Sequence, residues 1–290
     1  MSRPGPEHRL CLHLWRHLRR YLLLALALFL LWKALQFAGG WEAGRLESNY
    51  LQLPAETLPG AGSLRIAFLA DIHDNPTLLN KAVALVREAR PDLIILGGDY
   101  VTAGTRFKRT RRFILALREL AATAPTYAIL GNHDYEKLEQ VERVLQAAGI
   151  PLLRNEARDW QTPGGTTLRL IALGDWNEGD EAPERCMRPV GQEEHPVLLL
   201  SHDPESRWLL RSYDWDFMLS GHTHGGQLGI PFTHRYLSFR SSMPAGLFDF
   251  EGGRRIFVTR GVGAIMGMRF FCRPEVDIID IQPAAASAET

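Results

Sequence analysis

The sequence predicts an α/β layered domain that follows one N-terminal hydrophobic helix. Short segments of almost uniform hydrophobicity recur along the chain, and segments with apolar residues at three- and four-residue steps lie between several of them. Uniformly apolar strands are typical of a sheet covered on both faces, and their alternation with amphipathic helices is typical of layered α/β domains. A separate apolar run near the N-terminus predicts a helix that stands outside this domain.

The composition limits the kinds of partner. The 290 residues include 33 basic and 33 acidic side chains, so the formal net charge is zero. A nucleic-acid-binding surface needs an excess of basic residues, and we therefore expect no nucleic-acid partner. The three cysteines, Cys11, Cys186 and Cys272, are far apart and show no CxxC spacing. This predicts neither a disulfide framework nor a thiolate zinc site.

Residues 1–41 are predicted to form a single membrane anchor. Tyr21 to Trp32 is an unbroken apolar run that continues weakly beyond Lys33 to Ala38. Together these about 18 residues lie near the lower limit for a bilayer-spanning helix. Arginines are concentrated before the run, and Arg45 is the only basic residue between it and Gly60. The positive-inside rule then favours a cytoplasmic N-terminus in a bacterial inner membrane, with the domain on the periplasmic or extracytoplasmic side.

Other interpretations of this segment remain open. Gln36-Phe37-Ala38-Gly39 is a poor cleavage site, which disfavours a removed signal peptide. Arg19-Arg20 before an apolar stretch partly resembles a twin-arginine export signal. A monotopic helix on the cytoplasmic face also fits a short span with a basic flank. The expected organisation is an anchor (1–41), a polar linker with one short strand near Tyr50–Leu53 (42–63), the α/β domain (64–281) and a disordered tail (282–290).

Clusters of metal-binding residue types directly follow five predicted strands. We expect these side chains to lie together, because ligand sites in open α/β sheets lie beyond the carboxyl ends of the strands. Helices are predicted over Leu78–Ala89, Arg109–Ala121 and Tyr135–Ala148, and strands without a cluster over Arg255–Val258 and Val276–Ile281. The five strands with their clusters are Leu64–Ala70 with Asp71 and His73, Leu93–Leu96 with Asp99, Tyr127–Leu130 with Asn132 and His133, Pro196–Leu200 with His202, and Phe217–Leu219 with His222 and His224.

These residue types predict a site for two metal ions. Carboxylate, amide and imidazole donors without sulfur favour manganese, with iron, zinc, cobalt or magnesium as alternatives. Seven donors exceed the need of one tetrahedral ion and suit two ions about 3.5–4 Å apart. Any one of them alone would be a common cap or buried polar group, so the prediction depends on their shared position. The predicted ligands are Asp71, His73, Asp99, Asn132, His202, His222 and His224, with His133 as the candidate proton donor.

The order of the motifs resembles that of the calcineurin-like metallophosphoesterase superfamily over roughly residues 64–281. The resemblance implies a four-layer αββα sandwich and an enzyme that hydrolyses phosphoester or pyrophosphate bonds. It implies that Asp71, His73, Asp99 and His224 hold one ion, that Asn132, His202 and His222 hold the other, and that Asp99 bridges them. It implies that His133 contacts the phosphate, with Asp99 and Asn132 as further catalytic residues. The matching motifs are Asp71-Ile72-His73, Gly98-Asp99, Gly131-Asn132-His133-Asp134, His202 and Gly221-His222-Thr223-His224.

A closer resemblance is to membrane-associated members of that superfamily. They share a hydrophobic N-terminus and stretches like Gly97–Val101, Gly221–Gln227 and Arg269–Val276, although Ala70 and Ile72 depart from their frequent Ser and Leu. They include exported phosphodiesterases and UDP-2,3-diacylglucosamine diphosphatases of lipid A synthesis. The resemblance implies a small-molecule or lipid-linked phosphoester substrate at the bilayer, with UDP-2,3-diacylglucosamine as the leading candidate. An exported general phosphodiesterase or phosphatase and a non-enzymatic metal-binding scaffold are the alternatives.

Three further features allow either a functional or a structural interpretation. A basic run after Asp99 can meet a diphosphate or lipid headgroups, or can be a solvated helix face. Aromatic and basic residues near the C-terminus can contact a membrane or pack in the core. Gly174-Asp175 repeats part of the earlier motif and is interpreted as coincidence. The basic run comprises Arg106, Lys108, Arg109, Arg111 and Arg112, and the C-terminal group comprises Arg269, Phe270, Phe271 and Arg273.

Overall fold

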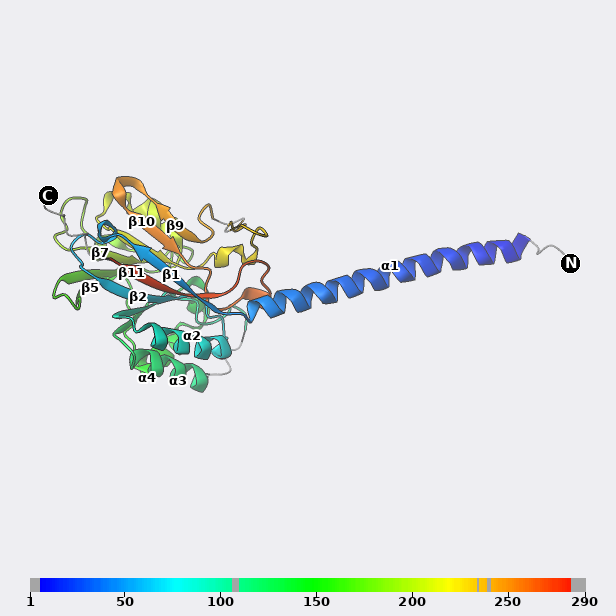
Figure 1. The fold of residues 1–290 in the computed structure, drawn as a ribbon, viewed down its shortest axis with the longest axis horizontal. Helices are drawn as coiled ribbons and strands as arrows, with labels where there is room; N and C mark the ends of the chain where they lie inside the picture. Colours follow the sequence, from blue (N-terminus) through cyan, green and yellow to red (C-terminus); the bar gives the residue numbers. More distant parts are fainter. Residues whose placement is uncertain (1–5, 106–109, 234, 239–240, 283–290) are drawn as a thin grey trace, which may run out of the picture.

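The fold consists of two stacked sheets with one long helix projecting from them (Figure 1). The computed structural model describes residues 6–105, 110–233, 235–238 and 241–282, with residues 6–14 described by their backbone only. The predicted disordered tail, from residue 283 on, and residues 106–109 of the basic run lie outside the described residues.

The first sheet has five strands, in the order β1 (Glu47–Leu53), β11 (Glu275–Ile281), β2 (Leu64–Leu69), β3 (Leu93–Leu96) and β4 (Thr126–Ala128). Neighbouring strands are parallel except β11 and β2. The sequence predicts that the segment 42–63 is a linker with one short strand near Tyr50–Leu53. That strand is present as part of the edge strand β1, so the folded domain begins at Glu47 rather than at Leu64. The reason is long-range pairing: β1 takes its hydrogen bonds from β11, at the other end of the chain.

The second sheet has six strands, in the order β5 (Glu156–Gln161), β6 (Thr167–Ala172), β7 (Val197–Leu200), β8 (Phe217–Ser220), β10 (Arg255–Val258) and β9 (Gly246–Asp249). The central strands β6, β7, β8 and β10 are parallel, and β5 and β9 are antiparallel edges. The five strands that precede the metal-binding clusters are therefore divided between two sheets, and their carboxyl ends meet at one end of the stack.

Three helices cover the outer face of the first sheet: α2 (Pro76–Ala89), α3 (Thr110–Ala121) and α4 (Leu138–Ala148). The Asn75 side chain caps α2 by accepting from the Leu78 N–H, and Pro76 begins the helix where no N–H is needed. These helices confirm the periodicity-based predictions, except that Tyr135–Lys137 belongs to a 3₁₀ segment, η2 (Asn132–Lys137), that precedes α4.

Alternating side chains of the strands build the layers. In β3, Ile94 and Leu96 pack against the helices, while Leu93 and Ile95 pack between the two sheets. On the outer face of the second sheet, the core includes Leu210 and Trp215. The four-layer sandwich is thus confirmed, with short 3₁₀ segments and loops forming the fourth layer. The described 3₁₀ segments besides η2 are η1 (Ala55–Thr57), η3 (Pro183–Arg185), η4 (Pro204–Ser212), η5 (His224–Gln227), η6 (Glu251–Gly253) and η7 (Ile265–Gly267).

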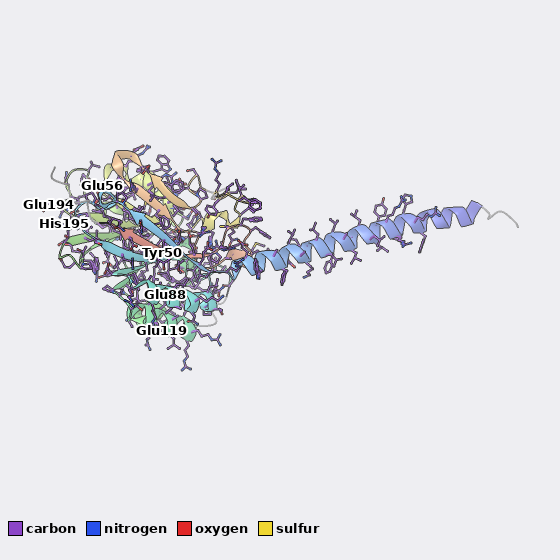
Figure 2. All side chains as sticks on the ribbon, in the orientation of Figure 1. Tyr50, Glu56, Glu88, Glu119, Glu194 and His195 are labelled. Atoms are coloured by element: carbon purple, nitrogen blue, oxygen red, sulfur yellow. The ribbon has the colours of Figure 1, made fainter. Side chains whose placement is uncertain are left out.

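The helix α1 (Pro6–Ala43) extends away from the domain, and its side chains project with no other part of the protein beside most of its length (Figure 2). An 18-residue window within its Trp15–Ala43 stretch has a mean hydropathy of 1.9, and the stretch has the length to cross a membrane. At its C-terminal end Gly39 packs against the Phe270 ring and Met268, and the Arg269 N–H donates to the Gly39 carbonyl over 3.0 Å. The helix therefore joins the domain without a flexible spacer.

Candidate active site

The loops after β2, β3, β4, β7 and β8 bring all the predicted ligands to one end of the stacked sheets. Four of them form a compact set, which we name the first donor group: Asp71, His73, Asp99 and His224. One donor atom from each lies within 4.8 Å of the others, and all four residues are buried. The His73 and His224 Nε2 atoms are 2.9 Å apart, and His224 Nε2 lies 3.4 Å from an Asp71 carboxylate oxygen. Their donor atoms therefore converge on one point.

The remaining predicted ligands, Asn132, His202 and His222, form the second donor group. His222 Nδ1 lies 2.9 Å from the Asn132 side-chain oxygen. His202 Nε2 lies 3.4 Å from Asp99 Oδ2. The same Asp99 oxygen lies 3.6 Å from His73 Nε2 in the first donor group. Asp99 thus faces histidines of both groups.

The donor chemistry of the two groups fits divalent ions. Asp71 Oδ2 and His202 Nε2 are buried and have no hydrogen-bond partner among the described residues. Buried polar atoms are rarely left without a partner, so unpaired atoms at a converging set of donors point to a ligand. Nitrogen and oxygen donors in this arrangement suit a first-row divalent metal or magnesium.

Electrostatics support the same interpretation. Burial raises the pKa of Asp71 to about 7 and lowers the pKa of His73 to about 4. Burial also opposes ionisation of Asp99, but His202 and His73 hold its pKa below the usual range. Two carboxyl groups thus share a buried space with a histidine that burial keeps neutral. Cations placed between these groups would offset the cost of burying negative charge.

The backbone at the site is strained. Asp71, His73 and Asp99 have φ angles of 56°, 48° and 54°, and His222 and His224 have 68° and 54°. Side chains other than glycine rarely adopt this left-handed region, and each such residue costs on the order of 1–3 kcal/mol. Strain concentrated on predicted ligands indicates that the fold holds them for function rather than for its own stability.

Hydrogen bonds to the outer side of the ligands set their orientation. His202 Nδ1 lies 2.7 Å from the Gly97 carbonyl, which can only accept, so Nδ1 carries the proton and the Nε2 lone pair faces Asp99. On His222, Nδ1 lies 2.9 Å from the Asn132 side-chain oxygen, and Nε2 lies 3.6 Å from Asp203 Oδ2, which places a carboxylate behind this ring. A hydrogen-bonded partner such as the Gly97 carbonyl fixes the tautomer and raises the basicity of a metal-binding histidine.

Two carboxylates that the sequence prediction did not assign to the site support it. Asp134 is buried, and its carboxylate accepts from the backbone N–H groups of Asp99, Tyr100, Val101 and Gly131. It therefore ties together the loops after β3 and β4. Asp203 stands behind His222 and accepts from the Asn177 side chain over 2.7 Å. The only sequence signal for either was its place directly after a predicted ligand or beside His133.

Position 131 requires glycine because there is no room for a side chain, and not because of its backbone angles. Its φ is −109°, an ordinary value. A Cβ atom there would overlap the Asp99 carboxylate and lie 2.7 Å from the His202 ring. The close approach of β4 to both donor groups therefore depends on this glycine.

His133 lies beside the first donor group, with its ring centroid 5.0 Å from that of His73. Its backbone N–H donates to Asp99 Oδ1, and its Nδ1 accepts from the Ala103 N–H over 2.8 Å. A backbone N–H can only donate, so Nδ1 is unprotonated and the neutral ring carries its proton on Nε2. The ring is thus prepared to donate from Nε2.

The structure also places the Gly174-Asp175 repeat, the C-terminal group and the basic run, for which the sequence allowed two interpretations. Asp175 is buried, and its Oδ1 accepts from the N–H groups of Asn177 and Glu178, so it closes a turn. Arg269 is fully buried and donates to backbone carbonyls, including that of Gly263. Arg111 and Arg112 are both exposed in the first turn of α3. Cys186 and Cys272 are free thiols.

Comparisons with known proteins agree with this site. A sequence model described as calcineurin-like phosphoesterase matches residues 64–226. The chain is 39% identical to phosphodiesterase YaeI of Escherichia coli over 76% of this chain and 83% of that protein. It is 26% identical to the uncharacterized metallophosphoesterase YkuE of Bacillus subtilis, over 86% and 92% of the two chains. It is 29% identical to a Danio rerio transmembrane protein with a metallophosphoesterase domain, over 81% of this chain and 57% of that protein.

The family match spans more than half of the chain and includes every strand-end motif from Asp71 to His224. The arrangement of buried carboxylates and histidines agrees with the divalent-metal chemistry of that family. The chain therefore belongs to the calcineurin-like phosphoesterase family and is a metal-dependent hydrolase of phosphoesters.

Proposed function

We propose that the protein holds two divalent metal ions, one on each donor group, and hydrolyses a phosphoester or pyrophosphate bond of a lipid-linked substrate at the membrane. The observation that carries the two-ion assignment is the position of Asp99. Its Oδ2 lies 3.6 Å from His73 Nε2 and 3.4 Å from His202 Nε2, so this carboxylate could serve an ion on either group. We take manganese as the ion to test, since carboxylate oxygens suit it, while the imidazoles also suit iron or zinc.

Two such ions supply Lewis-acid stabilisation of phosphate charge and lower the pKa of water. The protein contributes orientation. Asp134 fixes the loops that carry Asp99 and Gly131, the Gly97 carbonyl fixes the tautomer of His202, and Asp203 places a carboxylate behind His222. Loss of such supporting contacts typically weakens metal binding about 10–100-fold.

His133 is proposed to contact the phosphate through Nε2–H. Because Nδ1 is engaged by the Ala103 N–H, the neutral tautomer is a hydrogen-bond donor to a phosphoryl or leaving oxygen. Complete transfer of a proton from an imidazolium would require the Ala103 bond to break. His133 therefore stabilises the leaving oxygen by donation in the first instance.

A cleft lined by one histidine of each donor group supports a substrate with an apolar part. Its lining includes His222 and His224 together with Leu237 and Ile265. A phosphate at the metals would thus have apolar surface next to it. UDP-2,3-diacylglucosamine is the leading candidate, because it joins a pyrophosphate to acyl chains.

The second candidate is an exported general phosphodiesterase. The name of the relative in Escherichia coli, phosphodiesterase YaeI, favours it. So does the positive-inside rule, because the arginines that precede the apolar run, among them Arg16, Arg19 and Arg20, favour an extracytoplasmic domain. UDP-2,3-diacylglucosamine is a cytoplasmic nucleotide lipid, so the two candidates place the domain on opposite sides of the membrane. A non-enzymatic scaffold is disfavoured, because no predicted ligand is missing.

The test uses the full chain in detergent micelles loaded with Mn²⁺, because a truncation near Ser48 would remove Glu47, the ion-pair partner of Arg260 and Arg273. UMP release from UDP-2,3-diacylglucosamine and cleavage of an aryl phosphodiester are measured side by side. Asp99→Asn should lower either activity at least about 10³-fold, since several kcal/mol of charge stabilisation depend on the ions it bridges. Asp159→Asn, on the surface beside Arg169, is the matched control.

UMP release that Asp99→Asn abolishes would support the lipid-linked assignment and a cytoplasmic domain. Cleavage of the aryl diester without UMP release would refute that substrate and favour the exported phosphodiesterase. Activity that survives Asp99→Asn would contradict the two-ion site itself.

A further inference from the structure

Exposed apolar side chains surround the base of α1, and we name them the apolar rim: Phe37, Trp41, Leu228, Phe232, Met266 and Phe271. On the domain side, Phe232 is 105% exposed, Met266 83% and Phe271 57%. These loops gather at the end of the domain from which α1 projects (Figure 1). The domain therefore presents apolar tips beside the helix instead of the polar surface expected of a protein in water.

Hydrogen bonds hold the rim in place. The Gly229 N–H donates to the Phe270 carbonyl over 2.7 Å, which ties the hairpin bearing Leu228 and Phe232 to the segment bearing Phe271. Phe270 in turn packs on Gly39 of α1. The rim, the helix end and the hairpin are thus one connected structure.

The rim residues do not serve the stability of the fold in water. Phe232, Met266 and Phe271 have φ angles of 62°, 59° and 51°. Bulky residues in this left-handed region are outliers that cost on the order of 1–3 kcal/mol each, and glycine would avoid the cost. A strained backbone that exposes an apolar side chain indicates a binding role.

The position of α1 identifies the bilayer as the partner of the apolar rim. The apolar run of α1 continues to Ala38, and the next residue, Gly39, already contacts the domain. With no spacer between span and domain, the end of the domain beside α1 must lie at the bilayer surface. Arg45, stacked 4.4 Å from the Trp41 ring, and exposed Arg235 add the basic and aromatic groups that favour lipid headgroups.

We propose that the apolar rim inserts into the interfacial region of the bilayer that α1 crosses, and thereby holds the opening of the metal-site cleft against the lipid surface. Ile265, which lines the cleft, directly precedes Met266 in the rim. A membrane-borne phosphoester would then reach the metals without leaving the interface. The inference depends on the membrane attachment in the proposed function, but not on its chemistry.

The test places an environment-sensitive nitrobenzoxadiazole label on the full chain in nanodiscs of phosphatidylethanolamine and phosphatidylglycerol. Cys11→Ser and Cys186→Ser remove two of the three native thiols, and the third, Cys272, is buried. Labels at Phe232→Cys and Met266→Cys report on the rim. Glu194→Cys is the matched control, because Glu194 lies at the end of the domain remote from α1 (Figure 2). Quenching by spin-labelled lipid and by aqueous iodide is measured, together with the thermal midpoint of each labelled variant.

Labels at 232 and 266 should emit at shorter wavelength and be quenched by lipid several-fold more than the label at 194. Rim labels quenched by iodide as strongly as the control would overturn the proposal. A blue shift without lipid quenching would also overturn it and indicate a second copy or another protein as the occupant. Lipid-quenched labels on an inactive enzyme would refute the proposed function alone, and an active enzyme with water-exposed labels would refute the docking alone.

Discussion

The two donor groups of the active site differ in where they place negative charge. The first contains two carboxylates, Asp71 and Asp99, and all its members are buried. The second contributes one amide and two imidazoles, and Asn132 and His222 are only half-buried. Its carboxylate, Asp203, stands behind His222 rather than among the donors. In the first donor group, negatively charged carboxylates would contact the cation themselves. In the second, the negative charge of Asp203 would act on the cation only through the His222 ring.

This difference predicts unequal ions. Attraction between a cation and a carboxylate is strongest where both are shielded from water, which favours the first donor group. The second group depends on the shared Asp99 and on its supporting contacts. We therefore expect one tightly held ion on the first donor group and one on the second that exchanges more readily.

The largest expected effect comes from Gly131→Ala, which breaks both groups at once. The added methyl group would overlap the Asp99 carboxylate and press on the His202 ring. We expect loss of both ions and of activity, with a fall of about 1–3 kcal/mol in the free energy of unfolding. Metal analysis and chemical denaturation measure this. Gly164→Ala, where the nearest atom is 3.8 Å away, should change neither quantity, and wild-type metal content in Gly131→Ala would contradict the geometry.

Asp203→Asn should have a smaller effect, which is limited to the ion on the second donor group. The amide can still accept from the Glu205 N–H and cap η4, so the fold should persist. Loss of the charge behind His222 should weaken the second ion about 10–100-fold and leave the first unchanged. Titration of the apoprotein with Mn²⁺ tests this, with Asp159→Asn as control. Equal weakening of both ions would show that the two groups are not distinct.

The smallest expected effect is on stability alone. It tests whether a negative charge buried near the second donor group destabilises the folded protein. Burial raises the pKa of Glu181 from 4.5 to about 7, although Ser206 and Ser201 oppose the shift. The folded state then binds the proton more tightly than the unfolded state, so Glu181 lowers stability as pH rises from 4.5 through 7. Glu181→Gln should therefore gain stability relative to wild type as pH rises across this window. A difference in thermal midpoint that does not change with pH would contradict this.

Much of the site could be predicted from the sequence because its signal is local. Each ligand follows an apolar strand directly, so one rule about strand ends brings residues as distant as Asp71 and His224 together. The three- and four-residue spacing of apolar side chains gave the helices α2 and α3 within two residues at each end, but this local signal has a limit. It could not give the division into two sheets, which depends on which strands pair.

The parts that local patterns did not reveal depend on long-range contacts. The sequence predicts a strand near Tyr50–Leu53 but not its place in the sheet, because the partner of β1, β11, lies at the other end of the chain. β5 is mostly polar and exposed, so hydrophobicity does not mark it. Asp134 looked like part of a motif, but its four backbone partners are visible only in the folded loops. Likewise, only the structure shows Phe232 and Met266 exposed beside α1.

The central claim is that the two donor groups hold two unequal ions, and the HxH motif offers a matched pair of variants to test it. His222 belongs to the second group and His224, two residues later, to the first. Equilibrium dialysis against Mn²⁺, followed by metal analysis, should find two ions in the wild type. His222→Ala should retain one tightly bound ion, and His224→Ala should lose the tight ion. A single ion in the wild type, or the same residual binding in both variants, would contradict the account.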